Sequence, residues 1–234
     1  METLQRLGCH ACTVVTALTA QDSVNVRQVY PQAPEPFLEQ ARLVLADMPV
    51  SAVKIGLLGS AAIAGAVGEL LEDLARSRAV PVVLDPILVA GGGYGLASAR
   101  LQSVLIERLI PLATVITPNT PEARALTGQG DASNSARALL ELGCPHVLVT
   151  GAHEEGAEVI NGWYAHDRIA PRLSTWPRLP GSYHGSGCTL AAALAGYLAQ
   201  GEAMEQAVTK AQAFAWKALN NGHQPGRGQF FPGR

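Results

Sequence analysis

The chain has 234 residues, a formal net charge of -2 and a hydrophobic fraction of 48%. This length fits one α/β domain or two small ones, and the apolar content suffices for a large core. Lys and Arg are scattered, so no basic surface for a nucleic acid stands out. The first residues are too polar for a signal peptide, and no apolar run has the length of a membrane-spanning helix. We therefore expect a cytoplasmic globular protein that binds neither nucleic acid nor membrane.

Apolar runs of strand character alternate along the chain with runs of helical spacing. Strands are predicted at residues 13–18, 52–58, 80–84, 114–117 and 146–150, and a strand pair at 159–170. Helices are predicted at residues 37–46, 60–76, 101–110, 121–126, 133–142, 187–199 and 204–220, followed by an irregular tail at 222–234. Such alternation predicts parallel β-α-β units, and nearly continuous apolar strands predict a sheet covered on both faces. The expected fold is one three-layer α/β/α domain with a mostly parallel central sheet.

Polar side chains follow several of the predicted strands. They are Gln21, Asp85, Asn119 and Thr150. In open parallel sheets, ligands bind beyond the carboxyl ends of the strands, which is where these residues would lie. The alternative is that they are polar simply because loops begin there.

The segment from His184 to Cys188 carries the clearest chemical signal. Gly185 and Gly187 allow the backbone to approach a ligand, and the Ala/Leu-rich run that follows predicts a helix. The first N–H groups of a helix lack partners and, with the helix dipole, form an anion site that would stabilise a transferring phosphate. Cys188 stands at this helix start, where a lowered thiol pKa would let it act as a base. The alternative is a buried, inert cysteine at a tight turn.

The run His-Gly-Ser-Gly-Cys-Thr-Leu, residues 184–190, resembles the signature of the hydroxymethylpyrimidine and phosphomethylpyrimidine kinases of thiamin biosynthesis. These belong to the ribokinase-like superfamily, most of which carries Asp at the position of Cys188. Further segments resemble the family in the same order, so that the resemblance covers essentially the whole chain: residues 7–22, 52–59, 84–90, 117–123 and 147–153.

The resemblance implies a ribokinase-like fold and transfer of phosphate from ATP, with Mg²⁺, to an aminopyrimidine or its monophosphate. It also implies a homodimer, because relatives of this fold are commonly dimers. By position in the matching motifs, it implies a catalytic group of Gly185, Ser186, Gly187 and Cys188, substrate contacts at Gln21, Leu57 and Ile87, nucleotide contacts at Asn119, Thr150 and Gly151, and a Mg²⁺ contact through water at Glu122.

The chain departs from the family pattern in two places. Thr150 stands where the family often has Lys, which implies weaker neutralisation of a phosphate. The family also begins with a strand and a glycine-rich turn, whereas this chain starts inside the helix that should follow them. We therefore expect a single domain, residues 1–234, that is short at its N-terminus and leaves backbone groups unpaired on the neighbouring strand. There are three interpretations: the start was assigned too late in the gene, the open edge pairs with another subunit, or the protein is a relic of the fold with impaired chemistry.

Two rival functions stay open at this point. Pyridoxal kinase shares the fold and acts on a hydroxymethyl group of an aromatic ring, although Cys188 in place of Asp argues against the better-known examples. The other rival is a protein that binds the pyrimidine without turning it over. The C-x-x-C of Cys9 and Cys12 could be a redox or zinc motif, or chance spacing of packed residues.

Overall fold

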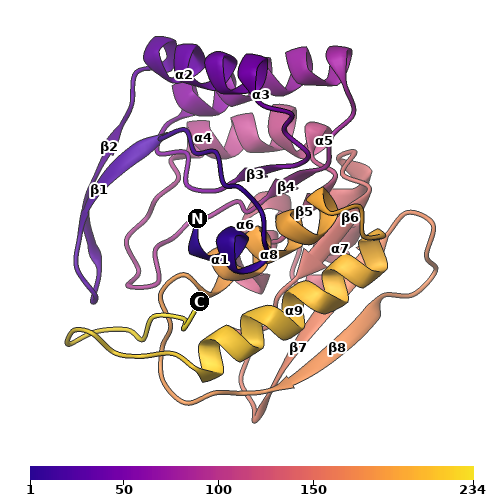
Figure 1. Cartoon of the computed structure of the whole chain (residues 1–234). Helices are drawn as coiled ribbons and strands as arrows, with labels where there is room; N and C mark the ends of the chain where they lie inside the picture. The colour runs from indigo at the N-terminus through magenta and orange to yellow at the C-terminus, as the bar shows by residue number, and fades with distance from the viewer.

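Six strands form the central sheet in the order β3-β4-β5-β6-β7-β8, in a computed structural model that describes residues 1–234 (Figure 1). The first four run parallel, and β7 and β8 continue the sheet antiparallel. Their bounds are β3 (Val53–Ile55), β4 (Val82–Leu84), β5 (Val115–Ile116), β6 (His146–Val149), β7 (Glu158–Ala165) and β8 (Arg172–Pro177). The predicted α/β fold with a mostly parallel sheet is confirmed.

Two hydrophobic cores, one on each face of the sheet, produce the three layers. Because successive side chains of a strand point to opposite faces, Val82 and Leu84 enter one core and Val83 enters the other. The larger core packs under the helices from α2 to α7, and the smaller one under α8 and α9 (Figure 1). The helices are α1 (Glu2–Arg6), α2 (Pro34–Asp47), α3 (Ala61–Ser77), α4 (Ala99–Val104), the π-helical turn η1 (Leu105–Leu109), α5 (Ile110–Leu112), α6 (Thr120–Thr127), α7 (Ala132–Glu141), α8 (Ser186–Ala199) and α9 (Met204–Asn220).

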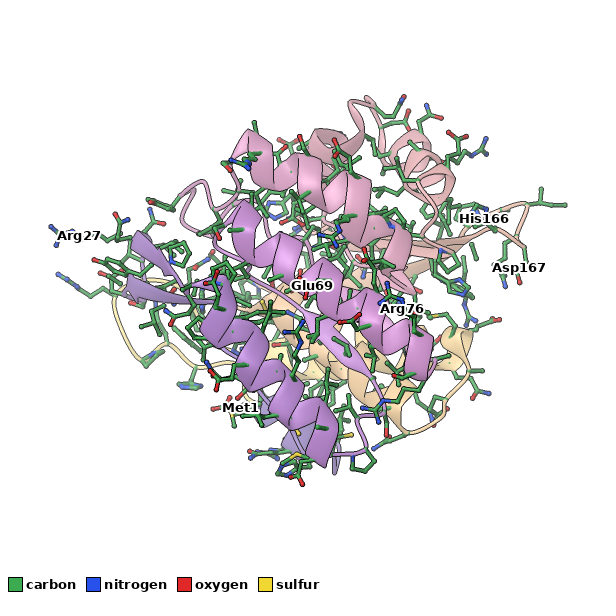
Figure 2. All side chains as sticks on the ribbon, turned by 90° about the horizontal axis from the view of Figure 1, so that it is seen from above. Met1, Arg27, Glu69, Arg76, His166 and Asp167 are labelled. Atoms are coloured by element: carbon green, nitrogen blue, oxygen red, sulfur yellow. The ribbon has the colours of Figure 1, made fainter.

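Helix α3 illustrates how the sequence specifies these elements. The Ser60 hydroxyl accepts a hydrogen bond from the Ile63 N–H at 3.2 Å and caps the helix start. Buried residues recur at helical spacing, with Ile63, Val67 and Leu71 on the face that meets the sheet. Figure 2 shows α2 and α3 side by side on the outside of the sheet, where Glu69 of α3 pairs with Arg42 of α2.

The first predicted strand, at residues 13–18, is wrong except for Ala17 and Leu18, with which β1 begins. Residues 13–16 form no strand, and the chain instead makes a separate antiparallel ribbon of β1 (Ala17–Gln21) and β2 (Val26–Pro31), whose second strand was not predicted. The ribbon extends from the body of the molecule, with Arg27 near its tip (Figure 2). Leu18, expected to be buried, is 58% exposed. The physical reason is a missing partner, because residues 13–16 pair with no strand of the sheet and β3 is itself an edge strand.

The remaining sequence predictions about these regions have mixed outcomes. The tail at 222–234 contains no helix or strand, as predicted. All four cysteines are free thiols, and no group of three or more metal-ligating side chains gathers around Cys9 and Cys12, so the zinc interpretation gains no support. None of the helices combines the length and apolar content that crossing a membrane requires.

Candidate active site

The turn before α8 leaves its first amides free. Gly185 is the N-cap residue and has a φ of 75°, a left-handed conformation that favours glycine. No side chain caps this helix, and the Gly185 carbonyl accepts the Thr189 N–H at 2.9 Å and the Thr189 hydroxyl at 2.7 Å. The N–H groups of Ser186, Gly187 and Cys188 therefore have no partner within the chain, which the predicted anion site requires.

A buried ion pair lies next to this turn. Lys54, on β3, places its Nζ 3.1 Å from Oδ2 of Asp85, the residue after β4. Their side chains are 20% and 6% exposed. Desolvation, the largest single effect, favours the neutral amine of Lys54, but the charge and hydrogen bond of Asp85, together with the nearby Cys188, outweigh it and raise the Lys54 pKa. The pair can form because Gly56 has no side chain: a Cβ there would lie 2.4 Å from the Lys54 Nζ.

The predicted low pKa of Cys188 is wrong. Desolvation of the thiol, followed by the negative charge of Asp85 beside it, raises the Cys188 pKa to about 12, although Lys54 acts in the opposite direction. The residue as a whole is exposed, although its thiol is surrounded by enough protein to be desolvated. The helix dipole alone would lower this pKa, but the fold places a carboxylate from another strand beside the thiol. In this arrangement Cys188 is a neutral thiol that faces Asp85.

Asn119 and Glu122 form a capping box at the start of α6. The Asn119 side chain accepts the Glu122 N–H at 2.8 Å, and the Glu122 carboxylate accepts the Asn119 N–H at 3.0 Å. The second Glu122 oxygen accepts the Leu88 N–H at 3.1 Å and so ties the loop after β4 to α6. Desolvation raises the Glu122 pKa to about 7, and the charge of Asp85 adds to the rise. Glu122 therefore lies beside the ion pair, as its expected role requires, and also has a structural role.

The expected nucleotide residues lie together at the ends of β5 and β6. Asn119 and Thr150 form a parallel bridge, and the Thr150 carbonyl accepts the Thr120 N–H at 3.1 Å. Gly151 is buried, and its N–H donates to the Asn161 side chain at 3.1 Å. A Cβ on Gly151 would lie 2.2 Å from the Ile160 carbonyl oxygen, so the close approach of β7 requires glycine here.

The tip of β1 brings Gln21 to the anion turn. Gln21 Nε2 lies 3.5 Å from His184 Nε2, although the two residues are 163 positions apart. The His184 N–H also donates to the Phe230 carbonyl at 2.8 Å, and its ring packs 5.2 Å from that of Phe231. His184 therefore braces the turn against the C-terminal tail and contacts Gln21 across the site.

Leu57 and Ile87 follow the ends of β3 and β4, which are parallel neighbours, so both lie at the same end of the sheet. The Leu57 carbonyl accepts the Thr16 hydroxyl at 2.5 Å. Ile87 has a φ of 31° and is the one non-glycine residue of the chain with a positive φ. A strained residue two positions after Asp85 is typical of a functional site.

Three residues of this region escaped the sequence analysis as site residues: Lys54, Asp85 and Arg234. Asp85 was noted only as a polar strand end. One signal could have revealed the pair, because a lone lysine inside an apolar strand needs a buried partner, and the next strand ends in an aspartate. The sequence gives no such signal for Arg234, because Arg234 is far from the turn along the chain and they meet only in the folded structure.

Solved structures define the class of this protein. A pyridoxal kinase from Staphylococcus aureus superposes with a TM-score of 0.87 at 29% identity, covering 99% of this chain and 84% of that one. A phosphomethylpyrimidine kinase from Clostridium difficile superposes with a TM-score of 0.78 at 30% identity, covering 93% and 90%. With a glycine turn and free helix amides at the strand ends, the chain is a phosphotransferase of the ribokinase-like fold.

Sequence comparisons define the family. The family model described as phosphomethylpyrimidine kinase matches residues 1–232. A hydroxymethylpyrimidine/phosphomethylpyrimidine kinase of Streptomyces coelicolor is 38% identical over 97% of this chain and 84% of that protein, and one of Haemophilus influenzae is 34% identical over 97% and 87%. A bifunctional thiamine biosynthesis protein of Geobacter sulfurreducens is 36% identical, and this chain spans 47% of its length. The chain belongs to the phosphomethylpyrimidine kinase family.

Proposed function

We propose that this chain transfers the γ-phosphate of ATP to 4-amino-5-hydroxymethyl-2-methylpyrimidine and to its monophosphate, as steps of thiamin biosynthesis. The names of its curated relatives support this substrate. The observation that carries the proposal is the convergence of the turn at Gly185, the thiol of Cys188 and the Lys54–Asp85 pair at one end of the sheet.

Positioning and charge neutralisation dominate phosphoryl transfer, and this chain offers both. The N–H groups of Ser186, Gly187 and Cys188 would bind the oxygens of the transferring phosphate. The ammonium of Lys54 keeps the nearby Asp85 from presenting an uncompensated negative charge to that phosphate. The turn and the ion pair thus act together on the same group.

Cys188 would contact the accepting hydroxyl. Its raised pKa excludes a resting thiolate near neutral pH, so the hydroxyl proton needs another acceptor. We assign that role to the carboxylate of Asp85, which lies beside the thiol, while Cys188 holds the hydroxyl in line with the phosphate. This modifies the role of base that the sequence predicted for Cys188.

Gln21 would recognise the pyrimidine, since an amide can donate to a ring nitrogen and accept from an amino group. Its position next to His184 puts it at the edge of the anion turn, where the hydroxymethyl group would enter. Leu57 and Ile87 would supply apolar contacts to the ring from the ends of β3 and β4.

ATP would lie along the ends of β5 and β6, beside Asn119, Thr150 and the backbone of Gly151. ATP analogues bound to a pyridoxal kinase of the same fold support it as the co-substrate. No group of three or more ligating side chains could hold a metal ion, and both Glu122 oxygens already accept backbone N–H groups. This donor set fits a Mg²⁺ ion that binds with the phosphates and meets Glu122 through water, which is how Mg²⁺ commonly binds.

A homodimer in the cytoplasm is part of the proposal. The commonest soluble oligomers are symmetric dimers, and light scattering after gel filtration would test the assembly. A monomer at micromolar concentration would contradict this part alone.

Pyridoxal kinase activity is the second candidate, because the S. aureus pyridoxal kinase superposes with the higher TM-score of the two structures compared above. The deciding experiment is ADP release by this chain with ATP and Mg²⁺, offered hydroxymethylpyrimidine, its monophosphate and pyridoxal in separate reactions. We expect turnover on the two pyrimidines. Turnover on pyridoxal alone would replace the proposal with the second candidate, and ligand binding without ADP release would indicate a binding protein.

A further inference from the structure

The C-terminal tail, residues 222–234, lies against the anion turn. The Phe230 N–H donates to the Ser182 carbonyl at 2.8 Å, and the His184 N–H donates to the Phe230 carbonyl at 2.8 Å, so the tail is paired with the strand-like approach to the anion turn. The Gln229 N–H donates to the Ser23 carbonyl at 2.7 Å, and its side chain donates to the Ser182 hydroxyl at 2.7 Å. The tail therefore connects the β1–β2 ribbon to the turn.

This pairing delivers the last side chain, Arg234, onto Gly185. A Cβ on Gly185 would lie 2.7 Å from the Arg234 Nη2, so the guanidinium is in contact with the N-cap of α8. The Gly233 N–H donates to the Ala218 carbonyl at 2.8 Å and fixes the backbone immediately before Arg234. Figure 1 shows both ends of the chain on this side of the molecule, next to α1.

The guanidinium is short of partners. Its Nε is buried and has no hydrogen-bond partner, and its nearest carboxylate is that of Glu2, 3.7 Å away and 72% exposed. The Arg234 side chain is 22% exposed. A guanidinium has five N–H donors arranged to bind a planar or tetrahedral oxyanion. The guanidinium is partly buried, has unused donors and lies beside free helix amides. It is therefore suited to bind an anion that a ligand supplies.

The other charges of the site explain why such a cation is needed. Lys54 is already neutralised by Asp85, and Thr150 carries no charge. The positive charge of Arg234 is felt at the turn, since it contributes to lowering the pKa of His184 and opposes the rise of the Cys188 pKa. Among the cations at the turn, Arg234 is the one that pairs with no buried side-chain carboxylate.

We propose that Arg234 binds the γ-phosphate of ATP from the side of Gly185, as a substrate-binding residue for the transferring group. The inference rests on the proposed kinase function and deepens it. Arg234 lies just beyond residues 1–232, which the family model matches. The guanidinium donates two N–H groups to oxygens of the phosphate, opposite the N–H groups of α8.

The test compares two nucleotides that differ in the γ-phosphate. Isothermal titration calorimetry of the full chain with ADP and with the β,γ-methylene analogue of ATP is performed on wild type, Arg234→Gln and Arg234→Lys. We expect Arg234→Gln to weaken binding of the ATP analogue roughly 10- to 100-fold, the range for a charge-assisted hydrogen bond, and to leave ADP within about two-fold. Arg234→Lys keeps the charge and is expected to fall between wild type and Arg234→Gln.

Arg227→Gln is the matched control, because Arg227 is in the same tail and is exposed. It should leave both affinities unchanged, and thermal unfolding of every variant verifies the fold. An Arg234→Gln variant with wild-type affinity for the ATP analogue overturns the inference, as does equal weakening of both nucleotides, which indicates a structural role. Pyrimidine turnover by the wild type is measured separately, so either result leaves the proposed function standing.

Discussion

Replacing Lys54 with Met tests whether the buried pair organises the site. The change removes one charge and leaves Asp85, 6% exposed, without its partner at 3.1 Å. At that separation the attraction is about 5 kcal/mol for an effective dielectric constant of about 20, before desolvation is subtracted. Removing one member of a buried pair typically costs about 3–5 kcal/mol. We expect Lys54→Met to lower the free energy of unfolding by about 3 kcal/mol and to abolish most turnover.

The assay is urea denaturation followed by circular dichroism at pH 7. The Lys54 pKa is raised in the folded chain, so the contribution of the pair is fully present below pH 10.5, its ordinary value, and is lost only as the pH rises through the higher folded pKa. A double variant, Lys54→Met with Asp85→Asn, should recover at least half of the lost stability, because it leaves no unpaired charge.

Lys210→Met provides the matched control for the pair. Lys210 pairs with Glu202 at the surface, where its side chain is 48% exposed, and its loss should cost less than about 1 kcal/mol. If Lys54→Met lowered the free energy of unfolding no more than Lys210→Met, the buried pair would contribute no more to stability than an exposed pair. That result would refute the expected cost of leaving Asp85 buried and unpaired.

Three further substitutions test other parts of the site. Because Cys188 positions the hydroxyl, Cys188→Ala should lower kcat by about 100-fold with the unfolding temperature unchanged, and near-normal ADP release would remove Cys188 from the mechanism. The Glu122 pKa rises from 4.5 to about 7 on folding, so wild-type stability should fall by about 3 kcal/mol between those pH values. Urea titrations of Glu122→Gln should lack this fall. Equal slopes in the two proteins would contradict the raised pKa. Gly151→Ala should cost about 2 kcal/mol or more because its Cβ would meet the Ile160 carbonyl, whereas Gly130→Ala, with nothing within 4 Å, should be tolerated in thermal unfolding.

The sequence predicted most helices because their signals are local. The cap of α3 at Ser60 and the recurring apolar positions Ile63, Val67 and Leu71 lie within one helix, so no distant residue is needed to recognise them. The same holds for the turn at Gly185, where two glycines and a following apolar run specify a helix N-terminus. The family motif at residues 184–190 likewise lies within one short segment.

Strand formation, by contrast, depends on a partner that the local sequence does not contain. Residues 13–16 are all β-branched, yet they pair with no strand of the sheet, and the Thr16 hydroxyl instead donates to the Leu57 carbonyl. The pairing of β1 with β2 was missed for the same reason. A strand is defined by its hydrogen bonds, and these join residues that are distant in the chain or depend on a turn between them.

The sequence by itself determined the α/β architecture, the anion turn and the family, because the signals for each lie in short runs of contiguous residues. Only the tertiary structure decided the electrostatics of the site. The thiol pKa of Cys188 depends on Asp85, about 100 positions earlier, which in turn depends on Lys54, and Arg234 reaches Gly185 only because the tail pairs with the approach to the turn. A charge acts through space with a strength that falls with distance and dielectric constant, and neither quantity can be read from the order of residues in a chain.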